Sequence, residues 1–264
     1  MKKLGTALFL IGLLILSTLT WAEEGKETSG AIEKITYTVS QDYRCFYSKE
    51  ILKRLAIGIG LAGGLANTSI DEEIQGYVQD TLRNTGTDKV SESVKPFGEG
   101  AITIPLYAGA ALFGEFTKDS KLGSTTGEWG KSSLRAILVG APPMLFLQRA
   151  TGGSRPKEDG SRWMPFNDNN GVSGHSFMGA VPFLTAAKGA DNLYVKCSLY
   201  LGSMLCGWSR INDNDHYFSQ AALGWWVAYL AASCGGRTGK ESKRLIVVPA
   251  SIKDGMGALA VLYF

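Results

Sequence analysis

The chain has 264 residues, of which 45% are hydrophobic and 19% charged, and this excludes a disordered chain or a small disulfide-stapled protein. It contains two histidines, His175 and His216, so a histidine-rich metal site is excluded. The net charge is +3, and loss of Lys2 and Lys3 with a signal segment leaves 25 basic and 24 acidic residues. A near-neutral chain gives no electrostatic case for nucleic-acid binding.

Residues 1–22 have the pattern of a secretory signal. Lys2 and Lys3 form a basic start, residues 7–16 are apolar, and residues 20–22 end at Ala22 as a plausible cleavage site. We therefore expect export to the cell envelope, either to a bacterial periplasm or to a membrane with the site facing the periplasm. An uncleaved anchor is the alternative, although residues 8–19 are short for a span.

Residues 23–48 are expected to form an N-terminal extension. Within it, residues 31–39 alternate between apolar and polar and predict a short strand or extended arm. Residues 49–236 are expected to form one helical domain. It begins with helices at 51–66 and 71–84, and the second carries three acids in its first turn, where the helix dipole favours negative charge.

Five more apolar segments predict helices at 101–116, 133–148, 176–187, 193–208 and 219–233. The fold class is therefore all-α, a bundle of about six core helices. Each segment is shorter than the roughly 20 apolar residues that cross a bilayer. A soluble bundle and a membrane bundle with polar faces both remain open, and we favour membrane association.

The tail, residues 237–264, is expected to form a β-hairpin. Residues 244–250 and 257–264 are β-like and lie on either side of residues 253–255.

Three cysteines lie in apolar helical segments and are expected to be buried free thiols: Cys197, Cys206 and Cys234. A bridge between Cys206 and Cys234 is the alternative.

Three polar segments carry candidate chemistry. The first, residues 148–156, ends a helix at two glycines and places Arg155 before a proline; a basic helix C-terminus is the alternative. The second, residues 171–176, offers Ser173 as an N-cap and the free N–H groups of Gly174 and His175 to an anion. An ordinary capped helix with an exposed histidine is the alternative there.

The third segment, residues 209–220, ends one helix and begins the next. His216 and Gln220 are four residues apart, so the amide lies within reach of the imidazole. A surface histidine is the alternative for this segment alone. Together the segments suit a phosphate: two arginines and a capped helix start bind its oxygens, one imidazole attacks phosphorus, and the other protonates the leaving oxygen. This chemistry requires no metal and no cofactor.

These segments resemble the signature of the type 2 phosphatidic acid phosphatase (PAP2) superfamily, which includes lipid phosphate phosphatases, acid phosphatases, glucose-6-phosphatase and vanadium haloperoxidases. The signature is Lys, six residues, Arg-Pro; then Pro-Ser-Gly-His; then Ser-Arg, five residues, His, three residues, Asp. The chain matches its order and inner spacings at 148–156, 172–175 and 209–220. The resemblance extends over about residues 50–235.

The resemblance implies roles for the matching residues. His216 would be the nucleophile that forms a phosphohistidine, and His175 the general acid. The phosphoryl oxygens would be bound by Arg155, Arg210, Ser173 and Gly174.

The chain departs from the signature at three positions. Val172 replaces proline. Gln148 replaces the lysine, and neighbouring Arg149 is a candidate to supply the lost charge, although one residue turns a helix by about 100°. Gln220 replaces the aspartate that orients His216; its carbonyl still accepts a hydrogen bond but carries no charge. Asp213 and Asp215 are candidates to replace that charge.

We therefore expect a metal-independent phosphatase acting on a phosphorylated small molecule or lipid. A lipid phosphate or isoprenoid pyrophosphate is favoured if the helices lie in a bilayer. A catalytically impaired, phosphate-binding envelope protein is the main alternative, and a vanadate-dependent haloperoxidase is a lesser one. The oligomeric state stays open.

Overall fold

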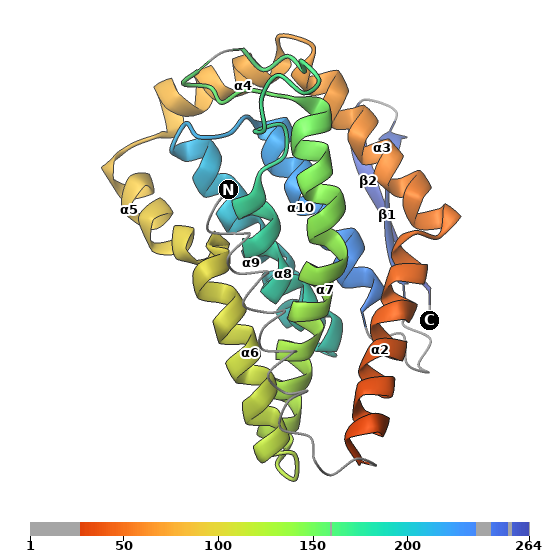
Figure 1. Cartoon of the computed structure of the whole chain (residues 1–264). Helices are drawn as coiled ribbons and strands as arrows, with labels where there is room; N and C mark the ends of the chain where they lie inside the picture. The colour runs from red at the N-terminus through yellow and green to blue at the C-terminus, as the bar shows by residue number, and fades with distance from the viewer. Residues whose placement is uncertain (1–26, 159, 236–243, 253–254, 264) are drawn as a thin grey trace.

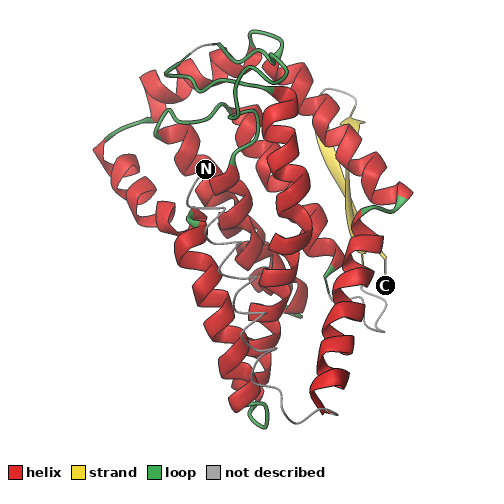
Figure 2. Ribbon diagram, in the orientation of Figure 1, coloured by secondary structure: helices red, strands yellow, loops and turns green. Residues whose placement is uncertain are grey.

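The computed structural model describes residues 27–158, 160–235, 244–252 and 255–263, and the predicted signal at 1–22 lies outside them. The described chain is a bundle of helices with one β-hairpin (Figures 1 and 2). The all-α class is therefore confirmed. The helical elements, in chain order, are α2 (Glu27–Phe46), α3 (Lys49–Ala66), α4 (Ile70–Tyr77), the π-helical turn η1 (Val78–Leu82), α5 (Thr85–Val94), the 3-10 turn η2 (Lys95–Gly98), α6 (Gly100–Phe116), α7 (Lys121–Thr151), α8 (Gly174–Gly189), α9 (Leu193–Asn212) and α10 (Phe218–Cys234).

Helix α8 occupies the centre of the bundle. It packs against α7, α9 and α10, and ten of its 16 residues are buried, because its sequence is apolar and small on every face. Gly224 allows α10 to approach the start of α8 closely: a Cβ added there would lie 2.3 Å from the carbonyl oxygen of Ser173. The core thus brings the first turns of α8 and α10 together.

The N-terminal arm is a correction to the sequence analysis. Residues 31–39 lie inside the 20-residue helix α2, not in a strand or extended arm. Tertiary contacts with α7 stabilise this helix: Tyr43 Oη donates to the carbonyl of Leu138 at 2.9 Å, and Asp42 forms an ion pair with Arg135. The alternation of β-branched residues was therefore misleading, since packing overrides a local preference for strand.

The cysteine pairing is a second correction. Cys234 is not the free thiol that the sequence predicted: it forms a disulfide with Cys45, at the end of α2, and not with Cys206. Cys206 is a buried free thiol, as expected, whereas Cys197 is free but exposed. Sequence spacing could not reveal the bridge, because its two cysteines are 189 residues apart and meet only when α2 packs beside the end of α10.

The predicted C-terminal hairpin is confirmed. Strand β1 (Arg244–Ile252) pairs antiparallel with β2 (Gly255–Tyr263), with Arg244 opposite Tyr263 and Ile252 opposite Gly255. Residues 253–254 of its turn lie outside the described chain.

The predicted helix at 71–84 is present as α4 followed by η1, but α5 and η2 were not predicted. Helix α5 is short and polar, and Asn84 caps it by accepting from the N–H groups of Gly86 and Thr87. Over the described residues, no helix combines the length and the apolar character that a bilayer crossing requires.

Candidate active site

The three polar segments meet at one end of the bundle, where α7 passes into its following loop (top of Figure 1). Gln148 Nε2, on α7, donates to the carbonyl of Val172 at 2.8 Å. The N–H of Ser173 donates to the carbonyl of Gln220 at 2.9 Å, and Gln220 Nε2 donates to the carbonyl of Ser154 at 2.7 Å. Hydrogen bonds therefore join all three segments into one cluster.

His216 is held in one orientation by Gln220. The imidazole is 5% exposed, and its Nδ1 lies 2.8 Å from Gln220 Oε1. The amide cannot turn round without loss, because its Nε2 donates to Ser154 and its Oε1 also accepts from the N–H of Tyr217 at 3.2 Å. Since Oε1 only accepts, Nδ1 carries the proton and Nε2 keeps its lone pair.

Both imidazoles are neutral at physiological pH. Burial lowers the pKa of His216 to about 4, and Arg210 and Arg155 act in the same direction against the hydrogen bond to Gln220. Burial also lowers the pKa of His175 to about 4, with contributions from Arg210 and Lys95 that outweigh Glu99 and Asp215. Arg210 acts on both histidines, so the two rings share one positive environment.

The start of α8 is open to a ligand. Ser173 Oγ accepts from the N–H of Ser176 at 3.3 Å, which makes it the predicted N-cap. Among the described residues, the N–H groups of Gly174 and His175 have no hydrogen-bond partner. Gly98 of η2 packs directly against His175, where an added Cβ would lie 2.9 Å from the histidine Cβ. The arrangement leaves two backbone donors for an anion.

The two arginines are held by neighbouring polar groups. Arg210 is 7% exposed, and its guanidinium forms an ion pair with Asp215 Oδ2 at 2.5 Å. Its buried Nε has no hydrogen-bond partner within the described chain. Arg155 Nε donates to Asn170 Oδ1 at 3.1 Å. A buried, unpartnered donor is costly unless a ligand completes it, so Arg210 Nε is the group that a bound phosphate would satisfy.

Gln148 and Arg149 take different positions relative to the start of α8. Gln148 lies beside Gly174, whose added Cβ would be 3.4 Å from the Gln148 amide. Arg149 is exposed, its carbonyl accepts from the N–H of Phe166, and the strongest charged neighbours of the two imidazoles do not include it. A role for Arg149 in place of the signature lysine stays a prediction.

The carboxylates of Asp213 and Asp215 do not replace the signature aspartate. Asp213 binds Lys95 at 2.6 Å and Ser91 at 2.6 Å, while Asp215 binds Arg210 and Lys157. These cations and the Ser91 hydroxyl pair with both carboxylates, and among the described residues the group that bonds to the Nδ1 of His216 is Gln220.

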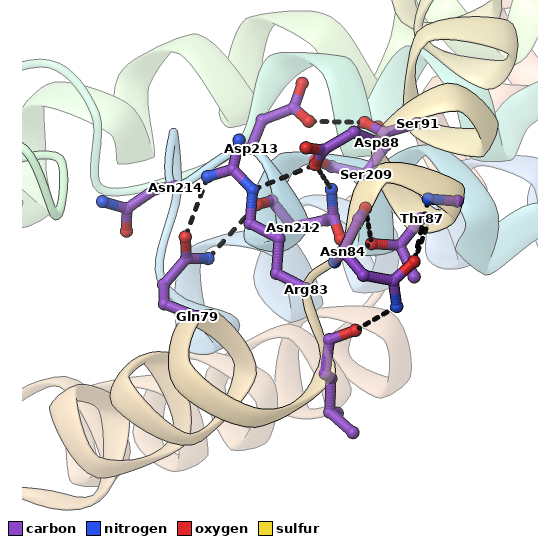
Figure 3. A network of polar contacts seen from close by, with 12 residues as sticks. Gln79, Arg83, Asn84, Thr87, Asp88, Ser91, Ser209, Asn212, Asp213 and Asn214 are labelled. Carbon is purple, nitrogen blue, oxygen red and sulfur yellow. Dashed lines mark hydrogen bonds and ion pairs between the residues drawn. The ribbon is translucent and has the colours of Figure 1, made fainter.

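Sequence reasoning missed a polar network that holds the last turn of α9 (Figure 3). Asp88 Oδ1, on α5, accepts from Asn212 Nδ2 and Arg83 Nε, each at 2.9 Å. Gln79 Nε2, on η1, donates to the carbonyls of Ile211 and Asn212 at 3.0 and 3.2 Å. The network fixes the turn that carries Arg210.

Two further groups were missed. Asn170 holds Arg155 and is itself held by Asp168, which accepts from Asn170 Nδ2 at 3.0 Å. Asp71 of α4 binds Ser219 of α10. The available sequence signal was the spacing of four between Asp71, Gln75 and Gln79, which places three polar side chains on one helix face.

The side chains that converge at the site are of the types that bind anions. Over the described residues, no three histidine, cysteine, aspartate or glutamate side chains come together as a group that could hold a metal ion. The polar groups that converge are instead cationic or N–H donors, the types that bind an anion.

Comparison with known proteins identifies the motif-bearing region. The family model of the PAP2 superfamily matches residues 132–235, somewhat less than half of the chain, and this confirms the resemblance. The matched residues begin within α7 and end just after α10, so they contain all three motif segments. No curated protein and no solved structure matches the chain.

Proposed function

The chain carries a PAP2-superfamily region at residues 132–235, and from this premise we propose that it is a phosphatase that hydrolyses phosphomonoesters through a phosphohistidine at His216. The PAP2 match indicates phosphatase-type activity on a phosphorylated substrate. The observation that carries the finer proposal is the neutral His216, whose Nδ1 is bound by Gln220 and whose Nε2 keeps its lone pair beside two arginines.

In the first step, His216 Nε2 attacks phosphorus as the bond to the ester oxygen breaks. The leaving oxygen takes a proton from the imidazolium of His175, so an alcohol departs. That proton binds as the substrate enters: burial, Arg210 and Lys95 lower the pKa of His175, and the phosphate charge offsets the two cations. Arg155, Arg210 and the start of α8 stabilise the phosphoryl oxygens throughout.

In the second step, water attacks the phosphohistidine. Neutral His175 takes a proton from the water as the new P–O bond forms and the N–P bond breaks. Phosphate and free His216 result, and the proton on His175 is ready for the next cycle. The Gln220 amide keeps the proton of His216 on Nδ1 through both steps. It adds no negative charge, so it stabilises the cationic phosphohistidine less than aspartate would.

The substrate class favoured by the surface is a lipid phosphate or an isoprenoid pyrophosphate. Apolar side chains are exposed along α6 and α9: Ile102, Leu106, Leu112, Phe113, Leu201, Met204 and Leu205. Exposed apolar side chains on both helices support contact with a membrane surface. The Cys45–Cys234 disulfide supports an exported protein in an oxidising compartment such as the periplasm.

The test is phosphate release by purified protein from soluble and lipid phosphomonoesters in EDTA. Wild-type protein should release phosphate, and His216→Ala should not. A phosphorylated intermediate that is stable in alkali and lost in acid should accumulate in a rapid quench of the wild type. Activity that depends on added metal, or that survives in His216→Ala, would contradict the proposed mechanism.

A second candidate, a catalytically impaired phosphate-binding protein, is favoured by Gln148 and Gln220 standing where the signature has lysine and aspartate. Gln220→Asp distinguishes the two. If the wild type is inactive and the Gln220→Asp variant is active, the protein is catalytically impaired.

Membrane association has its own test: the protein is sought in the membrane fraction and in the osmotic-shock fluid.

A further inference from the structure

One face of α4 and η1 lies along the loop between α9 and α10 and forms hydrogen bonds with it. Asp71, Gln75 and Gln79 follow one another at intervals of four residues, and each binds that loop or its flanks. Gln79 binds the end of α9, Gln75 the middle of the loop, and Asp71 the first turn of α10. His216 lies in this loop, upstream of α10, while α4 and η1 lie outside the PAP2-matched residues.

Asp71 is the charged member of this face. It is fully buried, and both carboxylate oxygens bind Ser219: Oδ1 accepts from its N–H at 2.9 Å and Oδ2 from its hydroxyl. Burial raises the pKa of Asp71, while these two bonds lower it. Ser219 precedes Gln220 in the first turn of α10, where the helix dipole stabilises a carboxylate.

The middle of the loop is held by Gln75. Asn214 has φ 58°, in the left-handed region that asparagine tolerates better than most residues other than glycine. Gln75 Nε2 donates to Asn214 Oδ1 at 2.7 Å and to the carbonyl of Ile211 at 3.0 Å. Helix α4 therefore fixes the loop on both sides of His216.

We propose that Asp71 is a positioning residue for His216, acting through Ser219 and the first turn of α10. It holds this turn so that Gln220 Oε1 meets His216 Nδ1. A neutral amide binds the imidazole less strongly than a carboxylate would, so the ring depends more on the rigidity of the turn that presents the amide. This inference rests on the proposed function and adds a helix outside the PAP2 match to the site.

The test compares Asp71→Asn with Asp42→Asn. Asp42 is a matched control because it is 3% exposed and accepts two bonds, from Arg135 Nε at 2.6 Å and from the terminal guanidinium nitrogen at 2.8 Å. It ties α2 to α7 and contacts none of the three motif segments. Both variants should lower Tm, since each leaves a buried network incomplete.

Only Asp71→Asn should change the chemistry. We expect kcat to fall about 10- to 100-fold with KM changed less than about twofold, the size of effect seen when a group that orients a functional side chain is lost. The ring ¹⁵N shifts of His216 should also move toward a mixture of tautomers. With two histidines in the chain, a His175→Asn variant assigns them. Ser219→Ala, which keeps the backbone bond, should show a smaller decrease in kcat.

The proposal is overturned if Asp71→Asn keeps the wild-type kcat and His216 ring shifts, or loses no more activity than Asp42→Asn. If Asp71→Asn does not fold, Ser219→Ala decides by the same two measurements. If wild-type protein releases no phosphate, the proposed function fails on its own. The ring shifts then still decide whether Asp71 orients His216.

Discussion

Helices α8 and α10 both begin at the candidate site, but their first turns are completed differently. At α10, the carboxylate of Asp71 binds Ser219, and the side-chain Oε1 of Gln220 accepts from the N–H of Tyr217. At α8, Ser173 caps the N–H of Ser176, and the N–H groups of Gly174 and His175 stay without partners in the described chain.

Because their first turns have different hydrogen-bond partners, the starts of α8 and α10 have different roles. A helix N-terminus attracts negative charge, and the protein supplies that charge itself at α10. At α8 the same positive end, with Arg210 nearby, is left for the ligand. The start of α10 therefore orients His216, and the start of α8 receives the phosphate.

The largest expected effect is at the α10 side. His216→Ala should reduce kcat at least about 10⁴-fold, because removal of a nucleophile leaves only the stabilisation provided by the binding groups. Rapid-quench detection of the phosphoenzyme measures the task of His216, and calorimetry with inorganic phosphate measures binding at the start of α8. Phosphate binding should persist, because its donors belong to α8 and the arginines. Loss of that binding in a folded variant would contradict the division of tasks.

The next effect concerns Arg210, which acts on the pKa of both imidazoles and has a buried Nε donor. Arg210→Lys should lower kcat about 10²- to 10³-fold, because lysine keeps the charge but loses Nε and the planar fork. Steady-state kinetics with a soluble phosphomonoester measures it. Arg135→Lys alters a partly buried, ion-paired arginine in α7, outside the site, and should leave kcat within about twofold. Equal losses in the two variants would show that Arg210 acts only through stability.

The pH dependence of stability tests the environment at the start of α8. The folded-state pKa of His175 is about 4, below its ordinary 6.5, so the unfolded chain takes up the proton first on acidification. The free energy of unfolding should therefore fall as pH decreases from about 6.5 to 4, with no contribution above that range. In His175→Asn, the loss between pH 7.5 and 5 in urea unfolding should be about 2 kcal/mol smaller. Identical losses would show that the ring is not held neutral.

The smallest effect comes from filling the open helix start. Gly174→Ala adds a Cβ that meets Gln148 at 3.4 Å, an ordinary contact, so stability should change little. The methyl group narrows the space between Gln148 and α8, and KM should rise about tenfold, or about 1.4 kcal/mol of binding. Gly189→Ala, at the other end of α8, meets no atom within 4 Å and serves as the control. An unchanged KM in Gly174→Ala would place the phosphate elsewhere.

Local spacing predicted the contacts that form within one turn of chain. The Ser173 cap and the approach of Gln220 to His216 depend on residues three or four apart, which helix geometry alone brings together. The acids at the start of α4 were interpreted only as complements to the dipole of their own helix. In the structure, Asp71 binds a different helix, a contact between residues 148 apart that no local pattern contains.

The same limit explains the errors. Residues 31–39 alternate like a strand, but their helix is stabilised by α7 and by a disulfide to α10. Cys234 was expected to be a free thiol, yet it meets Cys45 of α2, 189 residues away in the sequence. Long-range packing decided each of these cases.

The Cys45–Cys234 bond turns the chain between these residues into a covalent ring. Asp71, all three motif segments and both histidines lie within this ring. A single protease cut between its two cysteines, for example in the loop from α7 to α8, opens the ring without releasing a fragment. The two pieces separate on a denaturing gel only after reduction, and until then a nicked protein differs in mass from an intact one only by one water molecule.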